Sequence, residues 1–277
     1  MIDTALLAVA VHQNVTAALQ EDIATGDLTA RLIPAGLRAS AHIVCRETAV
    51  LCGRPWFEAC FRVLDPSFEI HWHAEEGQTI LPDQKLCEFN GNARALLSAE
   101  RCAINFLQTL SATATATRSY AQSVQGLATL VMDTRKTLPG LRVAQKYAVL
   151  TGGGNNQRMG LFDGILIKEN HISAAGGIAA ALAATQNVTV PVQIEVETLD
   201  ELQSALNAGA VLILLDNFGL DQLRAAVKLT RDRAILEASG GITLSNLRAI
   251  AETGVQRISI GAITKHIHAI DLSMRME

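Results

Sequence analysis

Two adjacent cations, Arg135 and Lys136, directly follow the apolar run of residues 128–132. Such a run is typical of a buried strand, and two positive charges at its end suit a carboxylate or phosphate ligand. Thr134 adds a hydroxyl donor, and the Pro-Gly pair that follows indicates a turn before the next helix. Taken alone, this segment is equally compatible with a basic loop that is exposed to solvent.

The region that contains these cations alternates regularly between expected strands and expected helices. The strands are expected at residues 128–132, 164–167, 192–196, 211–215, 234–238 and 257–260. The helices are expected at residues 141–150, 174–184, 199–208, 220–229 and 244–253. This order is typical of parallel βα units, and the spacing after residue 192 favours an incomplete, TIM-like parallel α/β barrel. A doubly wound open sheet is the alternative.

Polar residues follow each of the six expected strands, and the carboxyl ends of parallel strands meet at one rim. We therefore expect a single site for an anion. The residues that would contribute to it are Thr134, Arg135, Lys136, Lys168, Glu195, Asp216, Ser239, Gly240, Gly241, Ser259, Ile260, Gly261 and Ala262. A glycine-rich segment, residues 151–158, is interpreted as a helix stop and flexible loop that delivers Arg158 to the same rim.

The two carboxylates of this set, Glu195 and Asp216, would repel an anion. They are explained by a Mg²⁺ ion between them and a pyrophosphate, bound directly or through water, since Mg²⁺ is commonly held by one or two carboxylates and substrate phosphates. The small residues at 239–241 and 261–262 fall where barrels bind a phosphate, in the loops of the last two strands.

Several of these residues have alternative interpretations. Asp216 could cap a helix, and Lys168 could form a Schiff base as in barrel aldolases. His71 and His73 could bind a metal, but without a nearby third ligand the alternation of a strand explains them better. His171 is compatible with either a general base or a structural residue.

The N-terminal part of the chain has a mixed α+β character, and we place a domain boundary after residue 112. Helices are expected at residues 4–19, 55–64 and 99–120, and strands at residues 39–45 and 68–74. The barrel is expected to occupy residues 113–264. A net charge of −4 and an aromatic content of 4% argue against nucleic-acid binding.

Membrane and secretory signals are absent from the sequence. The apolar segment 4–19 is too short to span a bilayer, and no basic region precedes it as in a signal peptide. The five cysteines form no C-x-x-C pair, which favours reduced thiols over disulfides or a zinc site. We therefore expect a cytoplasmic protein.

Motifs along nearly the whole chain resemble those of the quinolinate phosphoribosyltransferase family, the carboxylating nicotinate-nucleotide pyrophosphorylases. The most specific are residues 134–142 and 166–171, and others lie at 100–108, 152–158, 195–197, 215–217, 239–242 and 259–262. The resemblance implies an N-terminal α/β sandwich, residues 1–112 joined by residues 265–277, and the incomplete barrel. It also implies a homodimer in which Arg101 reaches the neighbouring subunit's site.

The implied reaction joins quinolinate to the phosphoribosyl group of phosphoribosyl pyrophosphate, with Mg²⁺ as cofactor. It yields nicotinate mononucleotide, CO₂ and pyrophosphate for NAD biosynthesis. By the family pattern, quinolinate and the phosphates are surrounded by Arg101, Arg135, Lys136, Arg158 and Lys168. Glu195 and Asp216 serve the ribose and the Mg²⁺-pyrophosphate, and residues 239–241 and 259–262 hold the 5′-phosphate. The groups assigned to catalysis are Lys136, Lys168, Glu195 and Asp216.

Two positions depart from the family pattern. Gln157 stands where the family usually has histidine, and Ala112 where it usually has glycine. Gln157 can hydrogen-bond a carboxylate but cannot carry charge. Two further readings are a paralogous protein linked to molybdenum transport and a non-catalytic anion-binding barrel. The second is motivated by Gln157, although the retained lysines, Glu195 and Asp216 argue against it.

Overall fold

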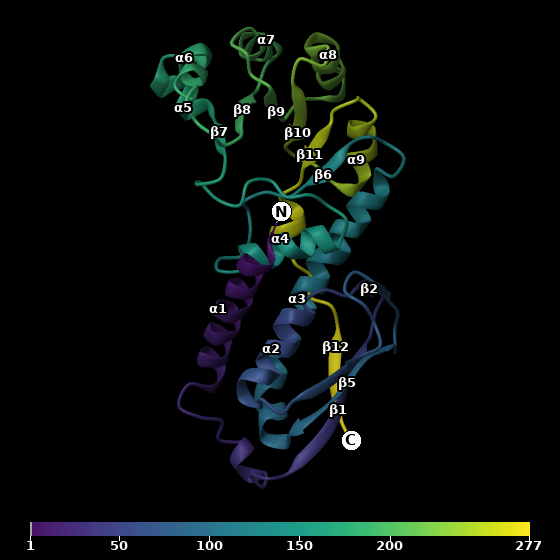
Figure 1. The fold of residues 1–277 in the computed structure, drawn as a ribbon. Coiled ribbons are helices and arrows are strands. Elements are labelled where there is room, and N and C mark those ends of the chain that lie inside the picture. The colour runs from purple at the N-terminus through teal and green to yellow at the C-terminus, as the bar shows by residue number, and fades with distance from the viewer. Residues whose placement is uncertain (1) are drawn as a thin grey trace. The chain divides into compact units, whose positions relative to one another are not determined.

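The computed structural model describes residues 2–277, which form two compact units (Figure 1). The first unit combines the chain up to Arg118 with Thr137–Gly153 and Ile263–Glu277, and the second combines Ser119–Lys136 with Gly154–Ala262. The chain therefore passes between the units more than once. The division into two domains after residue 112, which the sequence suggested, stays a prediction.

The first unit is built on an antiparallel sheet with the strand order β12-β1-β5-β3. Its strands are β1 (Arg38–Cys45), β3 (Glu69–Trp72), β5 (Lys85–Asn92) and β12 (Leu272–Met276), and a small second sheet pairs β2 (Ala49–Val50) with β4 (Thr79–Ile80). The C-terminal residues thus enter the sheet as the edge strand β12.

Helices supply the rest of the first unit. They are α1 (Thr4–Ile23), the short 3-10 turn η1 (Ala30–Leu32), α2 (Arg54–Leu64), α4 (Arg142–Thr151), the short α10 (Ala262–Lys265) and most of α3 (Ala93–Ser123). The Asp3 side chain caps α1 by accepting the Leu6 N–H at 2.7 Å. Trp56, Phe57 and Phe61 on α2 are completely buried in an aromatic core, whose burial supplies the main stabilising term for this unit.

The second unit is an open parallel sheet of six strands in the order β6-β11-β10-β9-β8-β7. The strands are β6 (Leu130–Met132), β7 (Ile165–Ile167), β8 (Val192–Val196), β9 (Leu212–Asp216), β10 (Ile235–Ser239) and β11 (Arg257–Ser259). The first two strands in sequence, β6 and β7, are the two edges and do not pair, so the barrel is incomplete. The predicted fold class is confirmed.

Helices alternate with these strands and lie outside the sheet (Figure 1). They are α5 (Glu169–Ala175), α6 (Ile178–Ala183), α7 (Leu199–Asn207), α8 (Leu220–Thr230) and α9 (Leu244–Ala251). The prediction of a single helix at residues 174–184 was wrong, because two short helices, α5 and α6, occupy this region. Gly176 and Gly177 adopt φ angles of 88° and 127° between α5 and α6, which a helix interior does not allow.

The other helices expected after residue 140 differ from α4, α7, α8 and α9 by no more than two residues at either end. The helix expected at 99–120 is part of the longer α3. None of the helices among residues 2–277 is both long enough and apolar enough to cross a membrane.

The glycine-rich segment after α4 is held at the edge of the sheet. Asn155 forms a parallel bridge with Met132 of β6. Its N–H donates to the Val131 carbonyl at 2.8 Å, and its carbonyl accepts the Asp133 N–H at 2.9 Å. These bonds anchor residues that the sequence predicted to be a flexible loop, and they fix the position from which Gln157 and Arg158 continue.

Candidate active site

The expected strand-end residues of β8 to β11 share one face of the parallel sheet. Register pairs Glu195 with Leu214, Leu214 with Glu237, and Asp216 with Ser239. Paired residues of parallel strands point to the same face, and side chains alternate along a strand. Glu195, Asp216 and Ser239 therefore project from the same face at the carboxyl edge, as the sequence predicted for a common rim.

Lys168 and Glu195 form an ion pair at this edge. The Lys168 ammonium lies 2.9 and 2.8 Å from the two carboxylate oxygens of Glu195. Lys168 is also the N-cap residue of α5, and its backbone N–H donates to Nδ1 of His171 at 3.0 Å. His171 thus has a structural role as a capping residue. An ammonium held by a carboxylate is a poor Schiff-base nucleophile.

Asp216 ends β9 and is not a helix cap. Its Oδ2 accepts a hydrogen bond from the Asn217 amide at 2.8 Å, while α8 begins at Leu220 with Gly219 as its N-cap. Asn217 adopts a left-handed φ of 58° and donates its N–H to the Ser239 carbonyl at 2.9 Å. The loops after β9 and β10 are therefore joined at the carboxyl edge.

The close packing of these two loops depends on Gly240. An added Cβ at Gly240 would lie 2.1 Å from Oδ1 of Asn217, although the same atom at Gly241 would meet open space. The Gly241 carbonyl accepts a hydrogen bond at 3.0 Å from Asn246 in the first turn of α9. The Ser239–Gly241 segment thus leads into a helix N-terminus, a geometry that favours anions.

The loops after β6 and β11 also meet. The Ile260 N–H donates to the Met132 carbonyl at 3.0 Å, and Oγ1 of Thr134 accepts the Lys136 N–H at 3.0 Å. The Lys136 side chain passes so close to Gly261 that an added Cβ there would lie 2.9 Å from Cδ of Lys136. Lys136 and Thr134 are therefore placed beside the 259–262 segment, for which a phosphate-binding role is expected.

The Arg158 guanidinium lies in a cationic region. Its Nη1 donates to the Gly164 carbonyl at 2.9 Å, which fixes the side chain. Burial and the positive charge of Arg135 hold the pKa of Arg158 below its usual range, and Asp163 opposes this only in part. Two cations that repel each other in this way would be stabilised by an anion bound between them.

Sequence reasoning missed three buried polar residues that organise this site. Asp133 is fully buried and accepts hydrogen bonds at 2.7 Å from the Gln157 N–H and the Asn156 amide. Gln193 and Glu237 are buried on the face that carries Glu195 and Ser239. A signal was present, because each lies two residues before an expected site residue and so points to the same face.

The Gln157 side chain contacts both Gln193 and Glu237. Its Nε2 donates to the two carboxylate oxygens of Glu237 and, at 3.4 Å, to Oε1 of Gln193. The structure therefore turns the amide NH₂ group of Gln157 towards Glu237. Its backbone and its side chain are both held, by Asp133 and Glu237 respectively.

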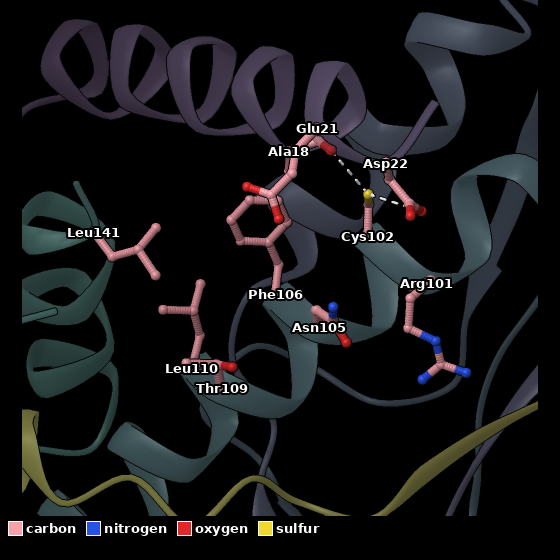
Figure 2. A pocket seen from close by; sticks show the side chains of 10 residues that line it. All are labelled: Ala18, Glu21, Asp22, Arg101, Cys102, Asn105, Phe106, Thr109, Leu110 and Leu141. Atoms are coloured by element: carbon pink, nitrogen blue, oxygen red, sulfur yellow. Dashed lines mark hydrogen bonds between the residues drawn. The ribbon is translucent and has the colours of Figure 1, made fainter. Parts of the chain in front are cut away.

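Arg101 belongs to the other compact unit. It is an exposed residue of α3 and lines a pocket of about 210 Å³ with Glu21, Asp22 and Asn105. Figure 2 shows its guanidinium directed away from the two carboxylates. In the same pocket Sγ of Cys102 donates to the Ala18 carbonyl at 3.4 Å. Burial and the negative charge of Asp22 raise the pKa of Cys102 to about 11, so this thiol is a poor nucleophile.

The two carboxylates expected to serve a metal fit Mg²⁺ rather than a softer ion. Glu195 and Asp216 offer only oxygen ligands from one face of neighbouring strands. Within residues 2–277 no group of three His, Cys, Asp or Glu side chains could hold a metal ion. Such an ion would therefore need oxygen ligands from its substrate or from water.

Comparisons with known proteins agree with this geometry. A family model described as the N-terminal domain of quinolinate phosphoribosyl transferase matches residues 27–111, and the model of the C-terminal domain matches residues 113–275. A probable carboxylating nicotinate-nucleotide pyrophosphorylase of Synechocystis sp. is 43% identical over 264 residues, covering 93% of this chain and 90% of its own length.

A similar protein of Bacillus subtilis, with the same description, is 40% identical over 257 residues and covers 92% of this chain and 89% of its own. Among solved structures, a nicotinate-nucleotide pyrophosphorylase from Francisella tularensis matches with a TM-score of 0.93 and 45% sequence identity. That match covers 97% of this chain and 96% of the Francisella chain.

Proposed function

Because this chain belongs to the quinolinate phosphoribosyltransferase family, we propose that it converts quinolinate and phosphoribosyl pyrophosphate to nicotinate mononucleotide. CO₂ and pyrophosphate are the other products, and the reaction serves NAD biosynthesis. The observation that carries this proposal is the carboxyl edge of the parallel sheet, where Glu195, Asp216 and Ser239 share one face. Lys168 pairs with Glu195 at this edge, and Lys136 lies beside Gly261. The molybdenum-linked paralogue and the non-catalytic barrel find no support in these matches.

Quinolinate is a pyridine with two adjacent carboxylates, and the cationic region fits its charge. Arg135 and Arg158 are the donors that suit carboxylates best, because a guanidinium can form two parallel hydrogen bonds. The depressed pKa of Arg158 beside Arg135 supports this assignment, since a bound dianion would relieve the repulsion between the two side chains.

The ribose and the pyrophosphate are assigned to a different set of residues, in which the carboxylates Glu195 and Asp216 are central. We assign Glu195 to the stabilisation of positive charge that develops at the ribose C1. The ion pair with Lys168, which holds the Glu195 carboxylate in place, supports this role. Mg²⁺, held by Glu195 and Asp216 together with substrate oxygens, would neutralise the pyrophosphate. Lys136 and the 259–262 segment suit the phosphate groups, because they combine a cation with closely approached backbone.

The chemistry needs positioning and charge stabilisation, with no covalent enzyme intermediate. The pyridine nitrogen forms a bond to C1 as the bond from C1 to the pyrophosphate oxygen breaks. The ring nitrogen becomes cationic, so the bond between C2 and its carboxylate can break. CO₂ leaves, the electron pair stays on C2 beside the pyridinium, and C2 then takes a proton. Holding the two substrates in line is a sufficient source of rate enhancement.

A homodimer with Arg101 completing the neighbouring site is part of the proposal. Arg101 is exposed on α3 and is directed away from nearby carboxylates, which leaves its charge available to another chain (Figure 2). Leu161 and Phe162 are large apolar residues that are 74% and 78% exposed, which supports a covered surface in an assembly. A cytoplasmic location is supported by five cysteines that are all buried thiols.

The decisive experiment combines the purified protein with quinolinate, phosphoribosyl pyrophosphate and Mg²⁺ and measures the released CO₂ and pyrophosphate. We expect equal amounts of both products, and no release when either substrate or Mg²⁺ is left out. Nicotinate in place of quinolinate is the control, since it lacks the carboxylate that leaves. Absence of both products with the full mixture would refute the proposed function.

A further inference from the structure

Glu237 is a buried carboxyl group that the proposed reaction does not use. It is completely buried in the second unit, at a register position beside Leu214 of β9 and Arg257 of β11. It lies two residues before Ser239, so its side chain is on the same face of the sheet and about 6–7 Å further from the carboxyl edge. Glu237 therefore lies in the layer of side chains directly beneath the substrate-facing edge.

Four groups surround the Glu237 carboxyl. The Gln157 and Gln193 amides donate to it, the latter at 3.1 Å, and the Ser259 side chain is a further hydrogen-bond partner. Arg257 contributes a positive charge from the neighbouring strand. A carboxyl this well partnered is unusual for a simple core position, because a buried charge is costly unless its partners are complete.

Two of these partners, Gln157 and Ser259, belong to the expected substrate site. Gln157 is the more informative, because it directly precedes Arg158, which is assigned to quinolinate. Its NH₂ group is directed to Glu237 and Gln193, while its backbone N–H is held by Asp133. Arg158 follows immediately in the chain and is itself fixed to the Gly164 carbonyl. Glu237 thus sets the orientation of the Gln157 side chain, although Glu237 itself lies one layer deeper than the carboxyl edge of the sheet.

We propose that Glu237 is a positioning residue, which orients the Gln157 amide and thereby sets the affinity of the site for the aromatic dicarboxylate. The proposal rests on the proposed function for its substrate. An ionised carboxylate is the best acceptor for two amide NH₂ groups. Burial raises the pKa of Glu237, so the hydrogen bonds from Gln157, Gln193 and Ser259 matter for keeping it ionised.

The test is a double-mutant cycle between Glu237→Gln and Gln157→Ala. A glutamine at position 237 presents one NH₂ group to two amide donors, so the Gln157 side chain must reorient. We expect the KM for quinolinate to rise about tenfold, the loss typical of one charge-assisted hydrogen bond, with kcat within about twofold. The KM for phosphoribosyl pyrophosphate should rise clearly less, although Glu237 also contacts Ser259 of the expected phosphate site. In the Gln157→Ala background the same substitution should change nothing further.

A matched control separates positioning from a loss of stability. Thr129 is also a buried polar residue of the second unit, and its hydroxyl donates to the Val255 carbonyl at 2.8 Å before β6 begins. Thr129→Val should lower the melting temperature and leave both KM values unchanged. If Glu237→Gln raises both KM values equally, or has the same effect with and without Gln157, the positioning role is wrong. A fall in the quinolinate KM would point instead to simple charge repulsion and would also overturn it.

A measurement without substrate keeps this proposal distinct from the proposed function. The side-chain NH₂ protons of Gln157, assigned in NMR spectra by their loss in Gln157→Ala, should exchange slowly with solvent in the wild type. They should exchange faster in Glu237→Gln and remain unchanged in Thr129→Val. If the wild type turns over no quinolinate but shows this pattern, the function fails while the positioning holds. Unprotected NH₂ protons in the wild type would refute the positioning.

Discussion

Arg135 is the residue whose charge most directly tests the assignment of the quinolinate subsite. We expect Arg135→Ala to raise the KM for quinolinate by about 30- to 100-fold, the loss of a bidentate charge-assisted contact, with a far smaller effect on phosphoribosyl pyrophosphate. Steady-state kinetics with each substrate varied in turn will measure both values. Arg224→Ala is the matched control, because that arginine lies exposed on α8 and pairs only with Asp221. Equal weakening of both substrates would contradict the division of roles.

The buried carboxyl of Glu237 also predicts how stability depends on pH. Burial raises the pKa of Glu237 in the folded state above its ordinary value of 4.5, which the unfolded chain is expected to show. Between these two values the folded state binds more protons, so its stability falls as pH rises through this window and stays lower above it. Glu237→Gln lacks this titration. Its stability relative to the wild type should therefore improve as the pH rises from 4 to 7.5.

Urea denaturation across that pH range will measure the difference between the two proteins. Thr129→Val serves as the reference, since it removes a buried hydrogen bond without altering any titratable group. Its difference from the wild type should stay constant with pH. A Glu237→Gln difference that is equally flat, or that worsens as pH rises, would show that the carboxyl is not destabilised by its burial.

The residues that sequence reasoning found and those it missed differ in a physical way. Glu195 and Asp216 lie at the ends of strands with a plain apolar pattern, and Lys168 directly follows one, so their place at the edge could be predicted from periodicity alone. Asp133 and Glu237 are one layer deeper, and their partners come from segments distant in sequence. Only the folded sheet brings Gln157 to Glu237, 80 residues further along the chain. Sequence periodicity shows which face a residue occupies, but not what lies opposite.

Among the structural elements, the loops that follow β9 and β10 are those on which the site depends most. Gly240 has a φ of 95°, and an added Cβ would lie 2.1 Å from Oδ1 and 2.9 Å from the backbone nitrogen of Asn217. Gly240→Ala must therefore separate the loops that follow β9 and β10. We expect it to cost about 2–4 kcal/mol and to weaken phosphoribosyl pyrophosphate binding, measured by denaturation and by calorimetry.

The neighbouring glycine provides the control for that prediction. Gly241 has a φ of 59°, and its added Cβ would meet nothing within 4 Å. Gly241→Ala should therefore cost only about 1 kcal/mol, the penalty of the left-handed conformation. If both substitutions prove equally mild, close packing of Gly240 against Asn217 is not what holds these loops together.

Element boundaries show why the helices were predicted unevenly. Helices that end at ordinary stop signals, such as α7 and α8, were placed to within one residue from their periodicity. The expected helix at 174–184 divided into α5 and α6 because two adjacent glycines take positive φ angles. Isolated glycines are tolerated in helices, whereas this pair satisfies the α5 carbonyls and redirects the chain. The two glycines are plain in the sequence, but the apolar residues on both sides of them favoured one continuous helix.

At the scale of the whole molecule, the segments of the two compact units alternate along the sequence. Residues 137–153 lie in the first unit although they sit between segments of the second. The expected motif 134–142 therefore begins in the second unit and ends in the first. Periodicity identified the strands and helices, but assigning α4 to a unit requires the long-range contacts of its buried residues, such as the bond of Gln145 to the Thr264 carbonyl at 2.8 Å.

The assembly of two chains is the level at which the role proposed for Arg101 can be decided. If Arg101 completes its neighbour's site, Arg101→Ala and Lys168→Ala proteins will each be nearly inactive. A heterodimer of the two contains one site with both defects and one site with neither. Random pairing makes half of the dimers mixed, so an equal mixture should recover roughly a quarter of wild-type activity.

The measurement is turnover after co-expression of the two variants with different affinity tags, followed by isolation of the mixed dimer. That species should show about half the activity of the wild-type dimer, because one of its two sites is intact. If Arg101 served its own subunit, each site of the mixed dimer would carry a single defect, and no activity would return. A monomer in sedimentation velocity at assay concentration would equally contradict the shared site. Recovery of activity would therefore establish both the dimer and the direction in which Arg101 acts.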